Sequence, residues 1–400
     1  MPVPGAYRRR VTVPGPDFTP VSGEEPPGLY LHIPFCKSRC AYCSFNSYAC
    51  QTPPAAYLAA LFTQIRYWGA QQWCRERTFT TLFVGGGTPT IYGDALATLV
   101  DLCLKSFSFT EDAEITVEAN PNTVNEQALS ALRRAGVNRL SLGVQAFSDR
   151  LLAGLGRSHT VAEADAAIKA ARRAGFVNIN LDLMYGLPGQ NAADWQESLA
   201  QALAHGPEHL ACYELTIEEQ TPFARLVDKG DLLLPDEDEA LAMAECTHAL
   251  LAQSGLGRYE ISNYATQGRE CRHNLNYWHN GSYLGLGAGA VSCLSGFRFS
   301  TVREPGEFVG LVEAGKLPLG EGECLPLTAR FRESVVMGLR MIQGVSFARL
   351  HRRFGLTPPG YYGKMLEDLQ QQGLVEVCHD HLRLTRVGLP VANQVLARLV

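Results

Sequence analysis

The feature of this sequence that most constrains its fold is a unit that recurs six times from residue 29 onward. Each unit begins with a short apolar run, passes through a turn rich in Gly, Pro or Asn, and ends in a longer segment with helical spacing. The predicted strands are 29–33, 81–84, 114–118, 139–144, 178–185 and 210–217. The predicted helices lie near 55–70, 94–106, 125–135, 161–174, 194–204 and 237–253.

Strands that alternate with helices favour right-handed βαβ crossovers and therefore a parallel sheet. Six units are fewer than the roughly eight that close a barrel, so we predict an α/β fold, an open partial (β/α)6 barrel. Ligands of such sheets bind at the carboxyl ends of the strands. Polar residues at those ends are therefore the first candidates for function.

The chain divides into three predicted parts. Residues 1–27 hold seven prolines and form a leader that we expect to be extended. Residues 28–315 contain the repeated units and form the predicted core, which carries the functional site. Residues 316–400 lose the alternation and form a small α+β domain that resembles a winged helix. Its predicted elements are two amphipathic helices and a hairpin, at 328–342, 361–372 and 373–385.

The charge distribution argues against a nucleic-acid partner. The formal net charge is -5, and the segment from Lys316 onward holds 11 Lys plus Arg against 7 Asp plus Glu. This is too weak a basic field to steer the chain toward nucleic acid. Because a fold alone does not give a function, we interpret the last domain as a packing or partner-contact domain.

The sequence predicts a cytoplasmic protein. No apolar run approaches the ~20 residues of a bilayer span, and the stretch after Arg10 is polar and broken by proline, unlike a signal peptide. Contact with a membrane is therefore expected only through partners. The twelve cysteines fit a few functional thiolates among buried thiols, because the cytosol keeps thiols reduced.

The strongest local signal is HIPFCKSRCAYCSF at 32–45, which spaces Cys36, Cys40 and Cys43 as C-x3-C-x2-C. Three thiolates on one loop can hold three irons of a cubane cluster, whose ligands are usually four cysteines. One iron then stays open to a small molecule. The alternative metal is structural zinc, which would need a fourth ligand such as His32 or Cys50.

This spacing, with the aromatic Tyr42 before the last cysteine, resembles the radical S-adenosylmethionine (SAM) superfamily. The resemblance implies a 4Fe-4S cluster whose open iron is chelated by the amino and carboxylate groups of SAM. It also implies that the reduced cluster can cleave SAM to a 5'-deoxyadenosyl radical, chemistry that the cofactor carries while the protein orients it.

The glycine-rich stretch VGGGTPT at 84–90 follows the second predicted strand and resembles the GGxTP segment that meets the methioninyl amino group of SAM. The resemblance implies that Gly86, Gly87 and Thr88 lie in the SAM site. Glycines let a backbone approach a ligand closely, and a phosphate loop is disfavoured because no GK[ST] follows. A plain strand-to-helix turn is the structural alternative.

SAM needs an Arg for its carboxylate and acceptors for its hydroxyls. Suitable groups near the ends of successive strands are Glu118, Gln145, Arg157 and Asp182. Their segments, and Tyr30 before the cysteines, resemble the coproporphyrinogen-dehydrogenase branch of the superfamily, which implies that these five residues line the SAM pocket. Taken singly, Glu118 could bond its own turn, Arg157 could pair at the surface and Asp182 could cap a loop.

Two features resemble the haem chaperones of this branch. Dehydrogenases typically carry a cysteine where this chain has Phe45. RHNLNYW at 272–278 resembles the HNxxYW motif, which implies haem contacts, and the residues concerned are His273, Asn274, Tyr277 and Trp278. Imidazole is a common haem-iron ligand and aromatic rings can stack on a porphyrin. A loop role for His273, core roles for the aromatics, and ligation by Cys271 stay open.

The resemblance implies that haem is cargo, passed to apo-haemoproteins of the respiratory chain, with the cluster and SAM in control or transfer. It leaves room for a partner that donates haem or electrons. Two enzyme alternatives stay open: oxidative decarboxylation of coproporphyrinogen III, and a SAM-dependent methyltransferase or cyclopropanase. The HNxxYW-like stretch argues against the second.

Overall fold

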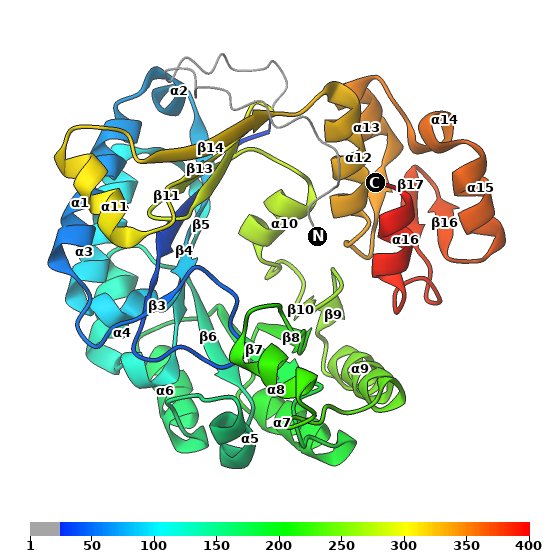
Figure 1. Ribbon diagram of the computed structural model, residues 1–400, viewed down its shortest axis with the longest axis horizontal. Coiled ribbons are helices and arrows are strands. Elements are labelled where there is room, and N and C mark those ends of the chain that lie inside the picture. The colour runs from blue at the N-terminus through cyan, green and yellow to red at the C-terminus, as the bar shows by residue number, and fades with distance from the viewer. Residues whose placement is uncertain (1–24) are drawn as a thin grey trace.

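The structure, a computed structural model, describes residues 25–400, so the predicted leader lies almost wholly outside the described residues. A curved sheet of twelve strands forms the core, and helices cover its outer face (Figure 1). Seven neighbouring strands run parallel. Their order is β11 (Tyr283–Leu286), β1 (Gly28–Ile33), β4 (Thr78–Gly86), β5 (Ser108–Ala119), β6 (Arg139–Gln145), β7 (Ile179–Tyr185) and β8 (His209–Glu214).

The predicted open α/β barrel is confirmed. Every predicted strand overlaps one of β1 and β4 to β8, and every predicted helix of the core ends within two residues of an observed one. These helices are α1 (Ala55–Gly69), α3 (Asp94–Ser106), α4 (Glu126–Arg134), α6 (Val161–Arg173), α7 (Ala192–Ala204) and α9 (Glu237–Gln253). Three shorter helices lie between them in the chain, α2 (Gln72–Arg75), α5 (Asp149–Gly154) and α8 (Pro222–Asp228), and α11 (Pro305–Glu313) follows later.

The sheet is wider than the six repeated units predict. A seventh parallel strand, β11, pairs with β1 although it comes much later in the chain. Antiparallel strands extend both edges, namely β12 (Val291–Leu294), β13 (Phe297–Thr301), β14 (Leu319–Cys324), β10 (Asn263–Ala265) and β9 (Gly257–Arg258). Because these strands are short or rich in glycine, their alternation is weak. The sheet thus continues to Cys324, and the domain boundary at 315 stays a prediction.

The two faces of the sheet differ in chemistry. On β1, Leu29, Leu31 and Ile33 are fully buried under the outer helices, whereas Tyr30 and His32 alternate to the inner face. A short helix, α10 (Arg272–Trp278), lies within the curve of the sheet (Figure 1). The inner face is therefore lined by polar side chains and closed on one side by α10.

Helix starts follow local capping chemistry. Three of the outer helices begin with reciprocal capping boxes, in which the cap side chain and the third helical residue bond each other's backbone N–H. The pairs are Thr160 with Glu163, Asn191 with Asp194, and Asp236 with Glu239. These caps fix where each helix leaves its loop.

The C-terminal region has a hydrophobic core of its own. Helices pack on a three-stranded sheet of order β15-β17-β16, which fits the predicted winged-helix-like pattern. Its elements are α12 (Leu327–Gly338), β15 (Val345–Ser346), α13 (Phe347–Phe354), α14 (Pro358–Tyr362), α15 (Lys364–Gln371), β16 (Val375–Cys378), β17 (His381–Leu384) and α16 (Ala392–Arg398). Across residues 25–400, no helix has the length and apolarity that a bilayer span requires.

Phe331→Ala should destabilise the C-terminal core by about 3–5 kcal/mol, since it empties a fully buried site that contacts Phe354, Tyr361 and Tyr362. Chemical denaturation followed by circular dichroism would measure the shift. Leu233→Ala, at an 80% exposed position, is the control and should change stability by less than about 0.5 kcal/mol. Equal shifts for the two variants would contradict this account of the core.

Candidate functional site

The three motif cysteines lie on one loop that is pinned at both ends. The loop leaves β1 through the two-residue strand β2 (Phe35–Cys36), which pairs with β3 (Tyr48–Ala49). The backbone N–H of Cys50 donates to the carbonyl of Cys36 at 2.7 Å. Within the loop, Cys43 N donates to Cys40 O at 3.2 Å, forming a turn. All three thiols are partly buried and free of disulfides, so they are available as thiolate ligands.

A chain of hydrogen bonds joins two of these thiols through residues from three other loops. Thr88 Oγ1 donates to Cys36 Sγ at 3.4 Å and accepts from Asn120 Nδ2 at 2.8 Å. Arg157 donates from Nη2 to Asn120 Oδ1 at 2.6 Å and from Nη1 to Cys40 Sγ at 3.3 Å. Donors of this kind stabilise thiolate charge and orient metal ligands.

The donor set fits a cluster better than a single ion. Among residues 25–400, no three His, Cys, Asp or Glu side chains converge on one point, as a zinc ion requires. The two residues that could complete a zinc site are engaged elsewhere. Cys50 Sγ donates to Thr52 O at 2.9 Å, and the His32 nitrogens bond Tyr30 Oη and Asn46 O at 2.9 Å each. A cubane takes one thiolate per iron, so its ligands need not converge.

The glycine-rich turn follows β4 and packs directly on the cysteine loop. Gly86 has φ +114°, and a Cβ there would lie 2.5 Å from the His32 ring; a Cβ on Gly87 would lie 2.6 Å from Phe35 O. Thr88 N donates to Phe35 O at 2.7 Å. Internal packing therefore requires glycine at these two positions. Contact between the backbone of this turn and SAM stays a prediction.

Two partly buried carboxylates, Glu118 and Asp182, interact electrostatically on neighbouring parts of the sheet. Glu118 lies one residue before the end of β5 and accepts from Gly86 N at 3.1 Å, while Asp182 on β7 accepts from Asn180 Nδ2 at 2.7 Å. Burial, and next the Asp182 charge, raises the pKa of Glu118 to about 7. Burial raises the pKa of Asp182 to about 6. Such a pair favours a cation or hydroxyl donors between its members.

Gln145 and Tyr42 complete the rim of this site. Gln145 ends β6 with φ +68°, next to a bulge at Gly143, whose carbonyl accepts from Arg157 Nη2 at 2.8 Å. The Tyr42 ring lies 6.3 Å from that of Phe223 on α8. The structure therefore places most of the predicted cluster and SAM residues around the carboxyl ends of β1 and β4 to β6, whereas Tyr30 and Asp182 lie in the middle of β1 and β7.

The predicted haem residues lie on α10, and its first turn faces the inside of the sheet. His273 is 1% exposed and stacks on Phe83 with ring centroids 5.1 Å apart. Its Nδ1 lies 2.7 Å from Thr81 Oγ1 and its Nε2 lies 3.0 Å from Tyr277 Oη. Both nitrogens are thus engaged, so iron ligation by His273 would require these bonds to break. Asn274 on the same helix is partly exposed.

A carboxylate from the sheet holds the start of α10. Glu114 on β5 accepts from the backbone N–H groups of Arg272 at 3.0 Å and His273 at 3.1 Å. A negative charge at a helix N-terminus is favourable. The buried Cys271 thiol donates to the same carboxylate at 3.6 Å, which gives this cysteine a structural role. The fully buried Arg139 adds positive charge nearby.

Comparisons with known proteins agree with this geometry. The sequence pattern of the Radical SAM superfamily matches residues 30–202, and that of the HemN C-terminal domain matches residues 325–391. The heme chaperone HemW of Bacillus subtilis is 37% identical over 369 residues, 92% of this chain and 97% of that protein. HemW of Mycobacterium tuberculosis (strain H37Rv) is 36% identical over 400 residues, 98% of this chain and 99% of that protein.

The chain belongs to the HemW family. A solved structure of Escherichia coli coproporphyrinogen III oxidase, HemN, also superposes with a TM-score of 0.81 at 25% identity, covering 94% of this chain and 90% of that chain. The predicted branch of the radical SAM superfamily is therefore confirmed. A 4Fe-4S cluster and SAM are the cofactors that this superfamily implies.

Sequence reasoning missed three residues of this HemW-family site. Asn120, which bridges Thr88 and Arg157, stands in the quoted VEANP segment, two residues after Glu118. Its position directly after a strand was the available signal. Glu114 lies in the middle of β5 and Arg139 begins β6, and no motif marks either position. Their role depends on contacts with α10, far away in the chain.

Arg157→Gln should weaken SAM binding by about tenfold or more while iron content stays unchanged. The variant removes a buried guanidinium, and hydrogen bonds to charged groups contribute about 1.5–3 kcal/mol, whereas the thiol ligands remain. Calorimetric titration of SAM into anaerobically reconstituted protein would measure this. Arg150→Gln, which breaks a surface pair with Asp194, is the matched control. Wild-type affinity in Arg157→Gln would remove Arg157 from the SAM site.

SAM affinity should rise with pH through about 7, the value to which the pKa of Glu118 is raised. Below that value Glu118 is protonated and attracts the SAM cation less, so affinity should fall about tenfold from about pH 8 to about pH 6. Titrations across this range would reveal the slope. Glu118→Gln should flatten it, and a steep slope in that variant would assign the pH dependence to another group.

Proposed function

We propose that this protein is a haem chaperone that binds haem and transfers it to apo-haemoproteins. The observation that carries the proposal is the match, over nearly the whole chain, to relatives named heme chaperone HemW. The partly buried thiols of Cys36, Cys40 and Cys43 support a resident 4Fe-4S cluster. The next cysteine along the chain, Cys50, uses its thiol in a hydrogen bond to Thr52 O.

When bound, the cluster supplies an iron site for SAM and an electron for its cleavage. The chain supplies the surroundings. Arg157 places positive charge beside the thiolates, where it can also meet the SAM carboxylate. Glu118 and Asp182 offer acceptors to its ammonium group and hydroxyls, and Tyr30, Tyr42, Gln145, Gly86, Gly87 and Thr88 shape the remaining wall.

The recipients that we propose are apo-haemoproteins of the respiratory chain, and a separate protein donates haem or electrons. Haem binding and transfer need no covalent chemistry, so SAM and the cluster would act by setting the conformation or redox state in which haem is held. The cytoplasmic location expected from the sequence stays a prediction.

Oxidative decarboxylation of coproporphyrinogen III is the second candidate, favoured by the superposition on HemN. The residue at 45 argues against it. Phe45, which stands where the dehydrogenases typically carry a cysteine, is 69% exposed beside the cluster loop. An exposed aromatic ring here is better suited to a contact with another molecule than to cluster chemistry.

Haem titration of the cluster-loaded protein should give a saturable change in the Soret band. Anaerobic incubation with reductant, SAM and coproporphyrinogen III should give no protoporphyrinogen, measured by chromatography. Escherichia coli HemN in the same assay is the positive control for the reagents. Protoporphyrinogen formation without saturable haem binding would favour the enzyme and overturn the chaperone.

A further inference from the structure

A cavity of about 290 Å³ lies where the C-terminal region meets the end of α10. Its walls come from α10, α12, α13, β15 and β17, so both parts of the protein contribute. We call it the junction cavity. Its lining residues are Trp278, His279, Ser334, Gly338, Met341, Gln343, Gly344, Val345, Ser346, Arg349, Leu350, Arg353 and His381.

The lining combines three kinds of chemistry. Met341, Val345 and Leu350 are buried apolar residues. His279 and His381 supply two imidazoles, and Arg349 and Arg353 supply two guanidinium groups. Such a mixture suits a flat, largely apolar ligand with carboxylates at one edge and a metal at its centre. Trp278 adds an indole ring to the lining, and the Arg340 guanidinium lies 4.8 Å from the centroid of that ring.

The two ends of helix α10 lie in different surroundings, the interior of the sheet and the junction cavity. His273 at its start is locked inside the sheet by Thr81 and Tyr277. His279 follows its last turn and lines the junction cavity, and its ring nitrogens make no hydrogen bond within residues 25–400. Burial and the nearby Arg349 and Arg353 lower the pKa of His279 to about 4, so the ring is neutral at physiological pH. A neutral imidazole is the form that binds iron.

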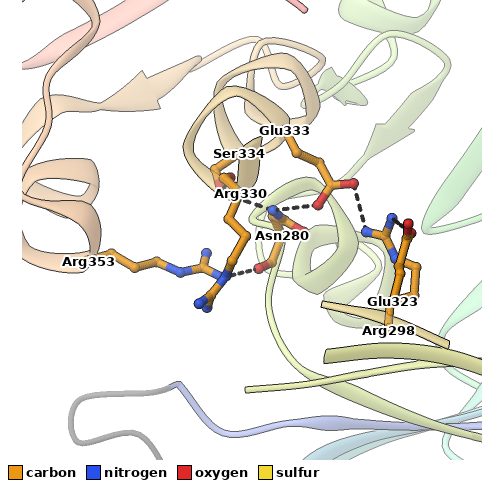
Figure 2. A network of polar contacts seen from close by, with 7 residues as sticks. All are labelled: Asn280, Arg298, Glu323, Arg330, Glu333, Ser334 and Arg353. Atoms are coloured by element: carbon orange, nitrogen blue, oxygen red, sulfur yellow. Dashed lines mark hydrogen bonds and ion pairs between the residues drawn. The ribbon is translucent and has the colours of Figure 1, made fainter. Parts of the chain in front are cut away.

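The arginines at this junction outnumber the carboxylates that pair with them. Figure 2 shows the Arg330 and Arg353 side chains converging beside Asn280. Arg353 donates to the carbonyl oxygens of His279 at 3.1 Å and of Asn280, and in the described part of the chain neither arginine has a carboxylate partner. Glu333 is committed to Arg298 at 2.7 Å.

Arg349 is the one arginine of the lining that holds a carboxylate, that of Glu25. Glu25 is exposed and lies just before β1, so this pair is open to solvent. The pair demonstrates that Arg349 can reach a carboxylate from the cavity rim. A ligand acid that replaces Glu25 there would keep the charge balance.

We propose that the junction cavity is the haem site, with His279 as the iron ligand and with Arg349 and Arg353 binding the propionates. The inference rests on the proposed function, because haem as cargo comes from there. It moves the iron ligand from His273 to the other end of the same helix. Trp278 then contacts the haem from α10, in line with the predicted role of this tryptophan.

The size of the cavity fits a transient cargo. Ligand pockets typically enclose about 300–1,000 Å³, so the cavity of about 290 Å³ lies just below this range and covers only part of a porphyrin. The uncovered edge would be accessible to a recipient protein. Two walls that belong to different parts of the fold also give a route to release, since a small change at the junction alters both at once.

Haem titration of the cluster-loaded full chain tests the site. His279→Ala should weaken haem affinity at least tenfold and shift the Soret maximum, and Arg349→Gln should weaken affinity severalfold. Two matched controls should bind as wild type. They are His248→Ala, an exposed histidine on α9, and Arg352→Gln, the exposed neighbour on α13.

Each result is decisive for one claim. Wild-type affinity and spectrum in both His279→Ala and Arg349→Gln would overturn the junction site while leaving the chaperone function intact, and a loss confined to His273→Ala would return the ligand to the sheet interior. Absence of saturable binding to the wild type would overturn the proposed function itself. Iron content and near-ultraviolet circular dichroism of every variant verify folding, and His279→Gln provides a milder replacement.

Discussion

One partly buried arginine links the segments on which the site depends. Arg157 donates hydrogen bonds to the Cys40 thiol, the Asn120 side-chain oxygen and the Gly143 carbonyl. Asn120 in turn donates to Thr88, which donates to Cys36. Loops that follow different strands are thus held in a single polar network. A planar group with five donors suits this task, because it satisfies several acceptors without moving.

The inside of the curved sheet holds several charged side chains that are buried or partly buried. Glu114 accepts hydrogen bonds from the first N–H groups of α10, and Arg139 lies nearby. Glu118 and Asp182 interact electrostatically with each other. Buried charges of this kind are costly unless paired. Glu114 and Arg139 balance each other, and Glu114 also bonds the N-terminus of α10. Glu118 and Asp182 near the cysteine loop have raised pKa values, so a bound cation would stabilise their charged forms.

Local sequence patterns predicted most of the strands and helices of the core and the three cysteines of the site. The six strands and helices follow from periodicity and caps, and the spacing of Cys36, Cys40 and Cys43 is a local property of one loop. What the sequence could not reveal depends on distant contacts. His273 lies within hydrogen-bond distance of Thr81, 192 positions away, and His279 and His381 line one cavity only because the C-terminal region packs against α10. Neither arrangement produces a periodic pattern in the sequence.

The pairing of β11 with β1 has a consequence for how the chain is made. Gly28 aligns with Tyr283, so the backbone groups on one edge of β1 stay unpaired until 255 further residues have been synthesised. At roughly 5–20 residues per second this takes about 13–51 s. During that interval an apolar strand with unpaired backbone groups is exposed to other nascent chains. The ribosome-bound intermediate is therefore the stage at which this protein most needs protection from aggregation.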